Sequence, residues 1–335
     1  METRPRVADD TVADDTAADD TVADGAVDFR SAAPVAGTLD VSWIHGAPRS
    51  GAGQDPPIQV HHYDEHTVIL RQSKSVHYEA PFMFLLFGND RALLLDTGAT
   101  ADAVAFPLRA TIDSLVDDWL ASHPRDKYDL VVAHTHGHGD HVAGDVQFAG
   151  RQHTTVVSRE ADAVREFFGF TSWPDEVVTF DLGGRVLEVQ GSPGHHRAAI
   201  TTYDPWTGFL LTGDTVIPGR LYVDNQREFL ASMDRMADFA VSRPVTHVLG
   251  CHIEMTRVPG RDFPLGATYQ PGEHSLQLTP AHLTEIRDAA RAAAGDRGVR
   301  RFGDFILYTE PRTSDLLKLM ARALAAKLRA RVRLS

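Results

Sequence analysis

The chain has 335 residues, 43% of them hydrophobic, which is enough to bury one large core. Its single cysteine, Cys251, excludes an internal disulfide and any cysteine-rich metal cluster. The formal net charge of −13 leaves no basic footprint for nucleic acid, and no apolar run reaches the roughly 18 residues of a membrane helix, so we expect neither partner.

The first 36 residues differ from the rest of the chain. Residues 1–28 hold nine acidic and two basic side chains, and a Val-Ala-Asp-Asp-Thr pattern repeats with small changes across residues 7–21. Such a segment has little apolar surface to offset its ordering entropy, so we expect residues 1–36 to form a disordered acidic tail; an acidic docking arm is the alternative. The chain also begins without the basic and apolar regions of a secretory leader, so we expect a cytoplasmic protein.

Short apolar runs and helical spacing alternate through the middle of the chain, after a Gly- and Pro-rich segment (residues 47–57) that indicates a surface loop. We expect strands over residues 67–70, 82–87, 92–95, 130–133, 156–157, 177–180, 186–189, 200–203, 209–211 and 246–249. We expect helices over 101–120 and 228–242. Mixed strands and helices in this order predict an α/β domain, over residues 37–260, with helices outside packed sheets.

Residues 261–335 form an expected C-terminal extension that is mainly helical. Helical patterns cover residues 280–294 and 314–334, with a strand pattern over 302–308. Residues 311–335 carry seven basic side chains against the single acid Asp315. Such a helix could contact a membrane or the acidic tail, but we expect its leucine stripe to pack on the domain while its charges stay in solvent.

A histidine-rich segment directly follows the expected strand over residues 130–133. Within six residues it holds four side chains of the kinds that bind zinc, which are His136, His138, Asp140 and His141. They can converge only if the backbone curls tightly, and the two intervening glycines, Gly137 and Gly139, permit the positive φ angles that such a curl can use. The segment predicts a metal site, with a chance histidine-rich surface loop as the alternative.

Other ligand-type side chains also follow expected strands. His195, Asp214 and His252 each come shortly after an apolar run, and so does Asp96. Strand ends in an α/β domain meet along one edge of a sheet, so we expect these side chains to converge. A complete ligand set of this kind argues against a chance surface loop.

This set of residues, in this order, resembles the motifs of the metallo-beta-lactamase superfamily over residues from about 60 to 255. The resemblance implies a four-layer αββα sandwich that holds two metal ions, usually zinc, with iron or manganese as the other metals to consider. It assigns the first metal to His136, His138 and His195, the second to Asp140, His141 and His252, and a bridging position to Asp214.

The resemblance also bears on neighbouring residues. It implies that Asp96 orients the ligand loop without binding metal. His195 directly follows Pro-Gly and so fits the ligand position better than His196 does. We expect Cys251 to be a small packed side chain and His134 to support the site or the fold.

A two-metal site predicts hydrolysis. Two cations would lower the pKa of a bridging water and give hydroxide at neutral pH, with Asp140 as the catalytic residue that orients this water. The segments around the site look apolar and uncharged, so we expect a small-molecule substrate that is an ester, thioester or lactone. No cofactor besides metal is expected, and a homo-oligomer stays open. Candidates for the pocket are Phe82, Tyr203, Arg220, Tyr222 and Tyr269.

Three other functions are compatible with the pattern. A persulfide dioxygenase type of oxidoreductase would use a single iron, and a phosphodiesterase of the same superfamily would use the same two-metal site. A metal-binding protein without catalysis is the third, and the intact ligand set disfavours it.

Overall fold

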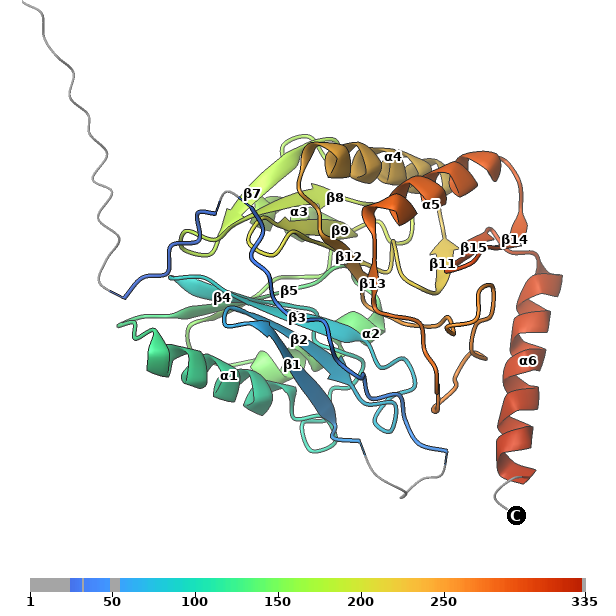
Figure 1. Ribbon diagram of the computed structural model, residues 1–335, viewed down its shortest axis with the longest axis horizontal. Helices are drawn as coiled ribbons and strands as arrows, with labels where there is room; N and C mark the ends of the chain where they lie inside the picture. Colours follow the sequence, from blue (N-terminus) through green and yellow to red (C-terminus); the bar gives the residue numbers. More distant parts are fainter. Residues whose placement is uncertain (1–24, 32, 49–54, 333–335) are drawn as a thin grey trace, which may run out of the picture.

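The computed structural model describes residues 25–31, 33–48 and 55–332, in which two six-stranded sheets pack face to face (Figure 1). The first sheet has the order β1-β2-β3-β4-β5-β6 and the second β13-β12-β10-β9-β8-β7. The strands of the first are β1 (Ile58–Asp64), β2 (Thr67–Gln72), β3 (Phe82–Phe87), β4 (Arg91–Leu95), β5 (Asp129–Ala133) and β6 (Thr154–Val156). Those of the second are β7 (Val177–Asp181), β8 (Val186–Gly191), β9 (Ile200–Asp204), β10 (Phe209–Gly213), β12 (His247–Gly250) and β13 (Gln277–Leu278).

Helices cover the outer face of each sheet. Helix α1 (Leu108–Ser122) packs on the first sheet, while α4 (Gln226–Ser242) and α5 (Pro280–Ala292) pack on the second. Helix α3 (Ala161–Phe168) contributes to the core between the sheets, and α2 (Gly139–Val142) and the 3-10 helix η1 (Ala143–Phe148) follow β5. The expected α/β class and αββα sandwich are therefore confirmed.

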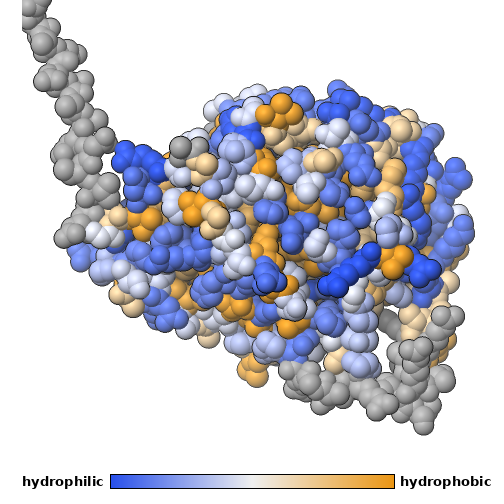
Figure 2. All heavy atoms as spheres, viewed as in Figure 1, coloured by the Kyte–Doolittle hydropathy of each residue, from blue (hydrophilic) through white to orange (hydrophobic). Residues whose placement is uncertain are grey.

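Side-chain alternation along the strands explains the layers. In β2, Ile69 faces the core between the two sheets, whereas Val68 and Leu70 face α1, and all three are fully buried. In β10, Leu211 lies in the same central core, while Leu210 packs under α4 and α5. Hydrophilic side chains cover most of the face seen in Figure 2, and hydrophobic residues gather there in small groups.

The expected strands of the two sheets all occur, with ends that shift by at most two residues. The helix expected over 101–120 begins only at Leu108, directly after Pro107. Several elements were not expected, namely β1, α3, β13 and two strands of a third sheet, β11 (Arg220–Val223) and β14 (Gly298–Arg301). These are short or have few buried residues in their runs, so their apolar pattern is weak.

The C-terminal extension is less helical than expected because it supplies strands to two sheets. Strand β13 extends the second sheet by pairing with β12. Strand β15 (Ile306–Thr309) lies between β14 and β11 in the third sheet, so the extension pairs with a strand of the main domain. The main domain and the extension therefore share strands of the same sheets.

Helix α6 (Thr313–Val332) stands at one edge of the molecule (Figure 1). Leu319 is buried, but Leu317, Met320 and Leu324 are each about 60% exposed, so the expectation that the leucine stripe packs on the domain is wrong for most of it. Arg322 fastens the helix through Asp262, with 2.5 Å between Nη1 and Oδ1. Within the described residues, no helix combines the length and apolar character needed to cross a bilayer.

Most of the expected acidic tail, residues 1–24 and 32, lies outside the described residues, as do residues 49–54 of the expected loop. The end of that tail packs on the domain, which differs from the expectation of disorder to residue 36. Phe29 is 7% exposed and meets the rings of His66 and Trp206 edge-on. The Val27 amide donates to Asn89 Oδ1 at 2.8 Å.

Arg185 ties the two sheets together inside the sandwich. Its guanidinium donates to Asp204 Oδ2 at 2.6 Å and to the carbonyl oxygens of His66 and Phe87. The side chains of Arg185 and Asp204 are 1% and 0% exposed. A charge at this depth is tolerated because every partner is an acceptor held in place.

We predict that Arg185→Gln lowers the free energy of unfolding by about 3–5 kcal/mol, because it leaves the Asp204 carboxylate buried without its cation. Urea or thermal unfolding measures the loss. Lys127→Gln is the control, since it breaks the exposed ion pair with Asp129 and should change stability by less than about 1 kcal/mol. Equal effects of the two substitutions would contradict the role assigned to Arg185.

Candidate metal centre

The predicted ligands lie at the ends of strands from both sheets. The segment 134–141 follows β5, and β5 runs parallel to β4, after which Asp96 comes. His195, Asp214 and His252 follow β8, β10 and β12 of the second sheet. The site is therefore built on the seam between the two sheets, where several strands end together.

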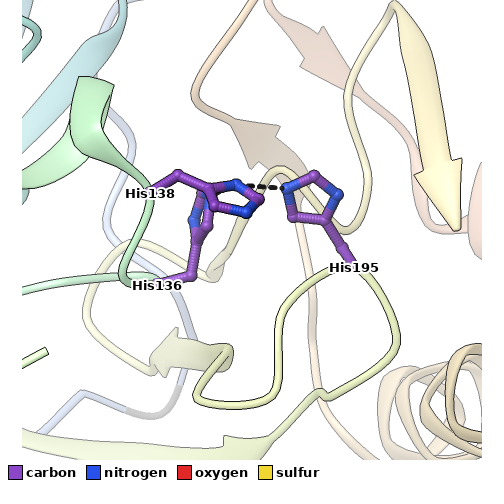
Figure 3. A group of neighbouring side chains, drawn as sticks. All are labelled: His136, His138 and His195. Carbon is purple, nitrogen blue, oxygen red and sulfur yellow. Dashed lines mark hydrogen bonds between the residues drawn. The ribbon is translucent and has the colours of Figure 1, made fainter. Parts of the chain in front are cut away.

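Three imidazoles converge in the first ligand group (Figure 3). His136, His138 and His195 offer ring nitrogens that lie within 4.8 Å of one another. His138 Nδ1 is 3.0 Å from His136 Nε2 and 3.1 Å from His195 Nε2. The rings of His136 and His195 are buried, so their Nε2 atoms face His138 in a site with little exposure to solvent.

The second ligand group adds carboxylates. It consists of Asp140, His141, Asp214 and His252, again within 4.8 Å. Asp140 Oδ2 lies 3.3 Å from His252 Nε2. Asp214 Oδ2 lies 3.6 Å from His141 Nε2 and 3.9 Å from His195 Nε2, so this carboxylate reaches both groups. The structure thus brings all seven predicted side chains together.

Hydrogen bonds behind the site fix which nitrogen of each ring carries the proton. His195 Nδ1 lies 2.9 Å from the Tyr222 carbonyl oxygen, and His252 Nδ1 lies 3.2 Å from that of Glu79. A carbonyl oxygen only accepts, so both rings donate from Nδ1 and turn Nε2 toward the site. His141 does the same toward Asp96 Oδ2, at 3.0 Å.

This protonation pattern fits a bound cation. The Nε2 atoms of His141 and His252 lie 3.4 Å apart with lone pairs turned to each other, which is repulsive unless a proton or a metal ion sits between them. The buried Asp214 Oδ1 also has no hydrogen-bond partner among the described residues. Imidazole nitrogens with a carboxylate are a donor set that zinc prefers.

The two groups differ in charge. Burial disfavours the ionised form of Asp214, yet His252 and His141 outweigh it and lower the pKa of this carboxyl to about 2. Burial likewise opposes a charged His252, but Asp214 and Asp140 raise the pKa of that imidazole to about 9. In the first group, burial and the neighbouring rings hold the pKa of His136 well below its usual value. The two carboxylates of the second group therefore favour a positive charge beside them, either a proton on His252 or a bound metal ion, and the first group offers neutral rings.

Asp96 holds the ligand loop from behind. It is fully buried with a φ of 71°, and it accepts hydrogen bonds from the Thr135 amide at 2.7 Å and the Thr135 hydroxyl at 2.8 Å. His141 Nδ1 and the Cys251 thiol also donate to it, the latter at 3.2 Å. Cys251 is fully buried, and burial raises the pKa of its thiol well above the usual value.

His196 supports the loop from the other side. Its Nδ1 accepts the Ala198 amide at 3.1 Å, and burial with the neighbouring His138 lowers its pKa to about 4. Gly137 packs against this ring, where an added Cβ would lie 3.0 Å from His196 Cε1. Neither Gly137 nor Gly139 uses the positive φ that glycine permits. Gly137 is needed for close approach instead.

His134 also lies behind the ligand loop and is 3% exposed. Its Nε2 lies 2.8 Å from Asp145 Oδ1, an oxygen that also accepts the Thr97 hydroxyl at 2.8 Å. These contacts join the end of β5 to η1 and to the turn after β4. They fit the supporting role that the sequence predicts for His134.

A cavity of about 250 Å³ opens onto both groups. Two predicted pocket residues, Arg220 and Tyr222, line it, whereas Phe82 and Tyr203 are buried in the core and Tyr269 lies against His45. The expectation of an apolar, uncharged pocket is wrong, because the lining includes three acids that the sequence did not single out, which are Glu79, Asp224 and Glu254.

Several known proteins are similar to this chain. Residues 79–241 match the family model of the metallo-beta-lactamase superfamily. Hydroxyacylglutathione hydrolase of Synechococcus sp. strain JA-3-3Ab is 33% identical over 32% of this chain and 44% of that protein, and the Methylococcus capsulatus enzyme of that name is 26% identical over 57% and 69%. A metallo-beta-lactamase structure from Pontibacter korlensis aligns with 70% of this chain and 99% of its own, at 18% identity and a TM-score of 0.46.

The seven ligand-type side chains, the sandwich that carries them and the matched sequence model define the class. The chain belongs to the metallo-beta-lactamase superfamily.

We predict that Asp96→Asn lowers the affinity of the second ligand group for zinc by about 10- to 100-fold. Asparagine has one acceptor oxygen where four donors converge, so His141 would lose its fixed tautomer. Metal content after dialysis against graded chelator measures the effect, with one zinc expected to leave before the other.

Asp118→Asn is the matched control, because it removes the same charge from the exposed face of α1. If Asp96→Asn retains both zinc ions as firmly as this control does, the role of Asp96 is refuted.

Proposed function

We propose that this chain is a two-zinc hydrolase that cleaves a small ester, thioester or lactone. The observation that supports the proposal is the pair of ligand groups beside each other at one cavity, with Asp214 within reach of both. Two metals about 3.5–4 Å apart are typical of hydrolases that activate water. A cavity of about 250 Å³ suits a small molecule.

Asp140 of the second group is placed to orient the attacking water. When bound, two zinc ions would supply an activated water and polarise the substrate carbonyl. Asp140 is 24% exposed, and although burial opposes its charge, its contacts with His252 and His141 keep the pKa of its carboxyl well below the usual value. An ionised carboxylate at the cavity can accept a hydrogen bond from the attacking water and orient it.

The relatives favour the thioester among the three substrate classes. Both hydroxyacylglutathione hydrolases bear the name of an activity that cleaves a thioester, and the stretches matched to this chain cover 44% and 69% of their lengths. A site for a single iron would need only the first ligand group, so the complete second group favours two metals.

We predict that the zinc-loaded protein hydrolyses at least one member of a panel of small esters, thioesters and lactones, and that it holds two zinc ions per chain. His138→Ala should lower kcat/KM by more than about 100-fold, because it removes a ligand of the first group. Asp118→Asn should leave kcat/KM unchanged. Metal analysis and initial rates on the same sample give the answer.

Two results would contradict this proposal. One iron per chain with oxygen uptake would indicate an oxidoreductase. Turnover of phosphodiesters alone would retain the metal centre but refute the substrate class.

A further inference from the structure

The cavity wall away from the ligands is polar and carries more acids than bases. Beyond the metal-ligand side chains, its lining consists of Glu79, Ile217, Arg220, Tyr222, Asp224, Glu254 and Leu265. Three of these are carboxylates and one is a cation. The charge that the wall presents to a substrate therefore depends on whether the Arg220 guanidinium is free to bind that substrate.

Arg220 is already occupied by the protein. Its side chain is 2% exposed, and its Nη1 donates to Asp262 Oδ2 at 2.7 Å and to the Phe263 carbonyl at 2.9 Å. Its Nη2 donates to Glu254 Oε1 at 2.8 Å, and its Nε to the Tyr222 hydroxyl at 3.2 Å. A substrate carboxylate would have to displace one of these partners, so Arg220 does not serve as an anion-binding group.

The guanidinium of Arg220 also neutralises the charge of Glu254. The backbone amide of Arg220 donates a further hydrogen bond to Glu254 Oε2 at 2.6 Å. Lys74 is the other cation close to the wall, but it does not line the cavity. It is 3% exposed and donates to the Tyr78 carbonyl at 3.1 Å, and burial lowers the pKa of its ammonium to about 8. Its nearby acids are Glu273, Glu254 and Glu79.

The other two carboxylates belong to residues whose backbone contacts the metal-ligand segments. The Glu79 carbonyl accepts from His252 of the second group, so its side chain starts beside that group. The Asp224 amide donates to the Gly194 carbonyl at 2.9 Å, directly before His195 of the first group. Within the described part of the chain neither carboxylate forms an ion pair, although Tyr78 shares a hydrogen bond with Glu79.

We propose that the substrate carries a protonated amine on the part remote from the scissile carbonyl, and that the acidic cavity wall binds this amine through Glu79 or Asp224. This inference rests on the proposed hydrolase function. An ammonium group donates three hydrogen bonds to acceptors that the wall leaves open. A carboxylate there would meet like charge, while Arg220, the one cation of the wall, is already paired with Glu254 and Asp262. The Tyr222 hydroxyl accepts from Arg220 and keeps its own proton for a neutral acceptor of the substrate.

The test uses three thioesters of equal length that end in an ammonium, a hydroxyl or a carboxylate group, with the zinc-loaded full chain. We expect kcat/KM to fall in that order, with the ammonium substrate ahead of the carboxylate substrate by about tenfold or more at low ionic strength. The ratio should narrow near 1 M salt because partly exposed charges are screened. Equal values for the three substrates, or a preference for the carboxylate, would overturn the proposal.

Substitutions in the cavity wall test whether Glu79 and Asp224 cause the preference for the ammonium substrate. The double variant Glu79→Gln with Asp224→Asn should bring the ammonium-to-carboxylate ratio close to one. Asp118→Asn lies on α1 and should keep the wild-type ratio. The control could instead change the ammonium-to-carboxylate ratio of kcat/KM as much as the double variant does. In that case the net charge of the protein, and not the cavity wall, sets the preference, and the proposal fails.

A binding measurement separates this inference from the proposed function. Amides that replace the three thioesters resist cleavage and can be titrated calorimetrically into the zinc-loaded protein. If no ester, thioester or lactone is hydrolysed but the ammonium amide binds at least about tenfold more tightly than the carboxylate amide, the hydrolase proposal fails and the preference stands. If hydrolysis occurs and the amides bind equally, the preference alone is refuted.

Discussion

Four donors converge on the buried carboxylate of Asp96, and the ligand loop depends on that convergence. The carboxylate holds both the backbone and the hydroxyl of Thr135, and it makes His141 donate from Nδ1. Carbonyl oxygens impose the same tautomer on His195 and His252. The Nε2 atoms of these rings therefore point inward before any ion arrives, which lowers the reorganisation that metal binding requires.

The sandwich provides a rigid base for this arrangement. Ligands come from strands of both sheets, so the site exists only when the sheets are packed in one relative position. The buried pair of Arg185 and Asp204 joins the two sheets and fixes that position in part. Breaking such a pair is costly, so it also opposes sliding of one sheet over the other.

Much of the fold and nearly all of the ligand set could be predicted from sequence. Continuous apolar runs such as β3 and β10 are fully buried, and their pattern is unmistakable. The ligands could be found because zinc chemistry restricts them to a few residue types at strand ends. His134 and Asp96 were also placed correctly behind the ligands.

The cavity wall could not be predicted, because its acids carry no motif. Glu79 and Asp224 lie in turns on separate segments, and only folding brings them to one cavity. Arg220 and Tyr222 were candidates, yet the sequence does not show that the guanidinium is already paired with Glu254 and Asp262. Short strands such as β11 were missed for a related reason, since their stability comes from pairing with distant segments.

Strand β11 limits how this scaffold can be redesigned. Its Tyr222 contributes a carbonyl to His195 and a side chain to the cavity, and its register is set by Tyr308 of β15, some 86 positions later. A slip of one residue would turn Tyr222 to the opposite face of the sheet and withdraw its carbonyl from the imidazole. Grafting a foreign C-terminal segment to change substrate preference would therefore alter metal affinity at the same time.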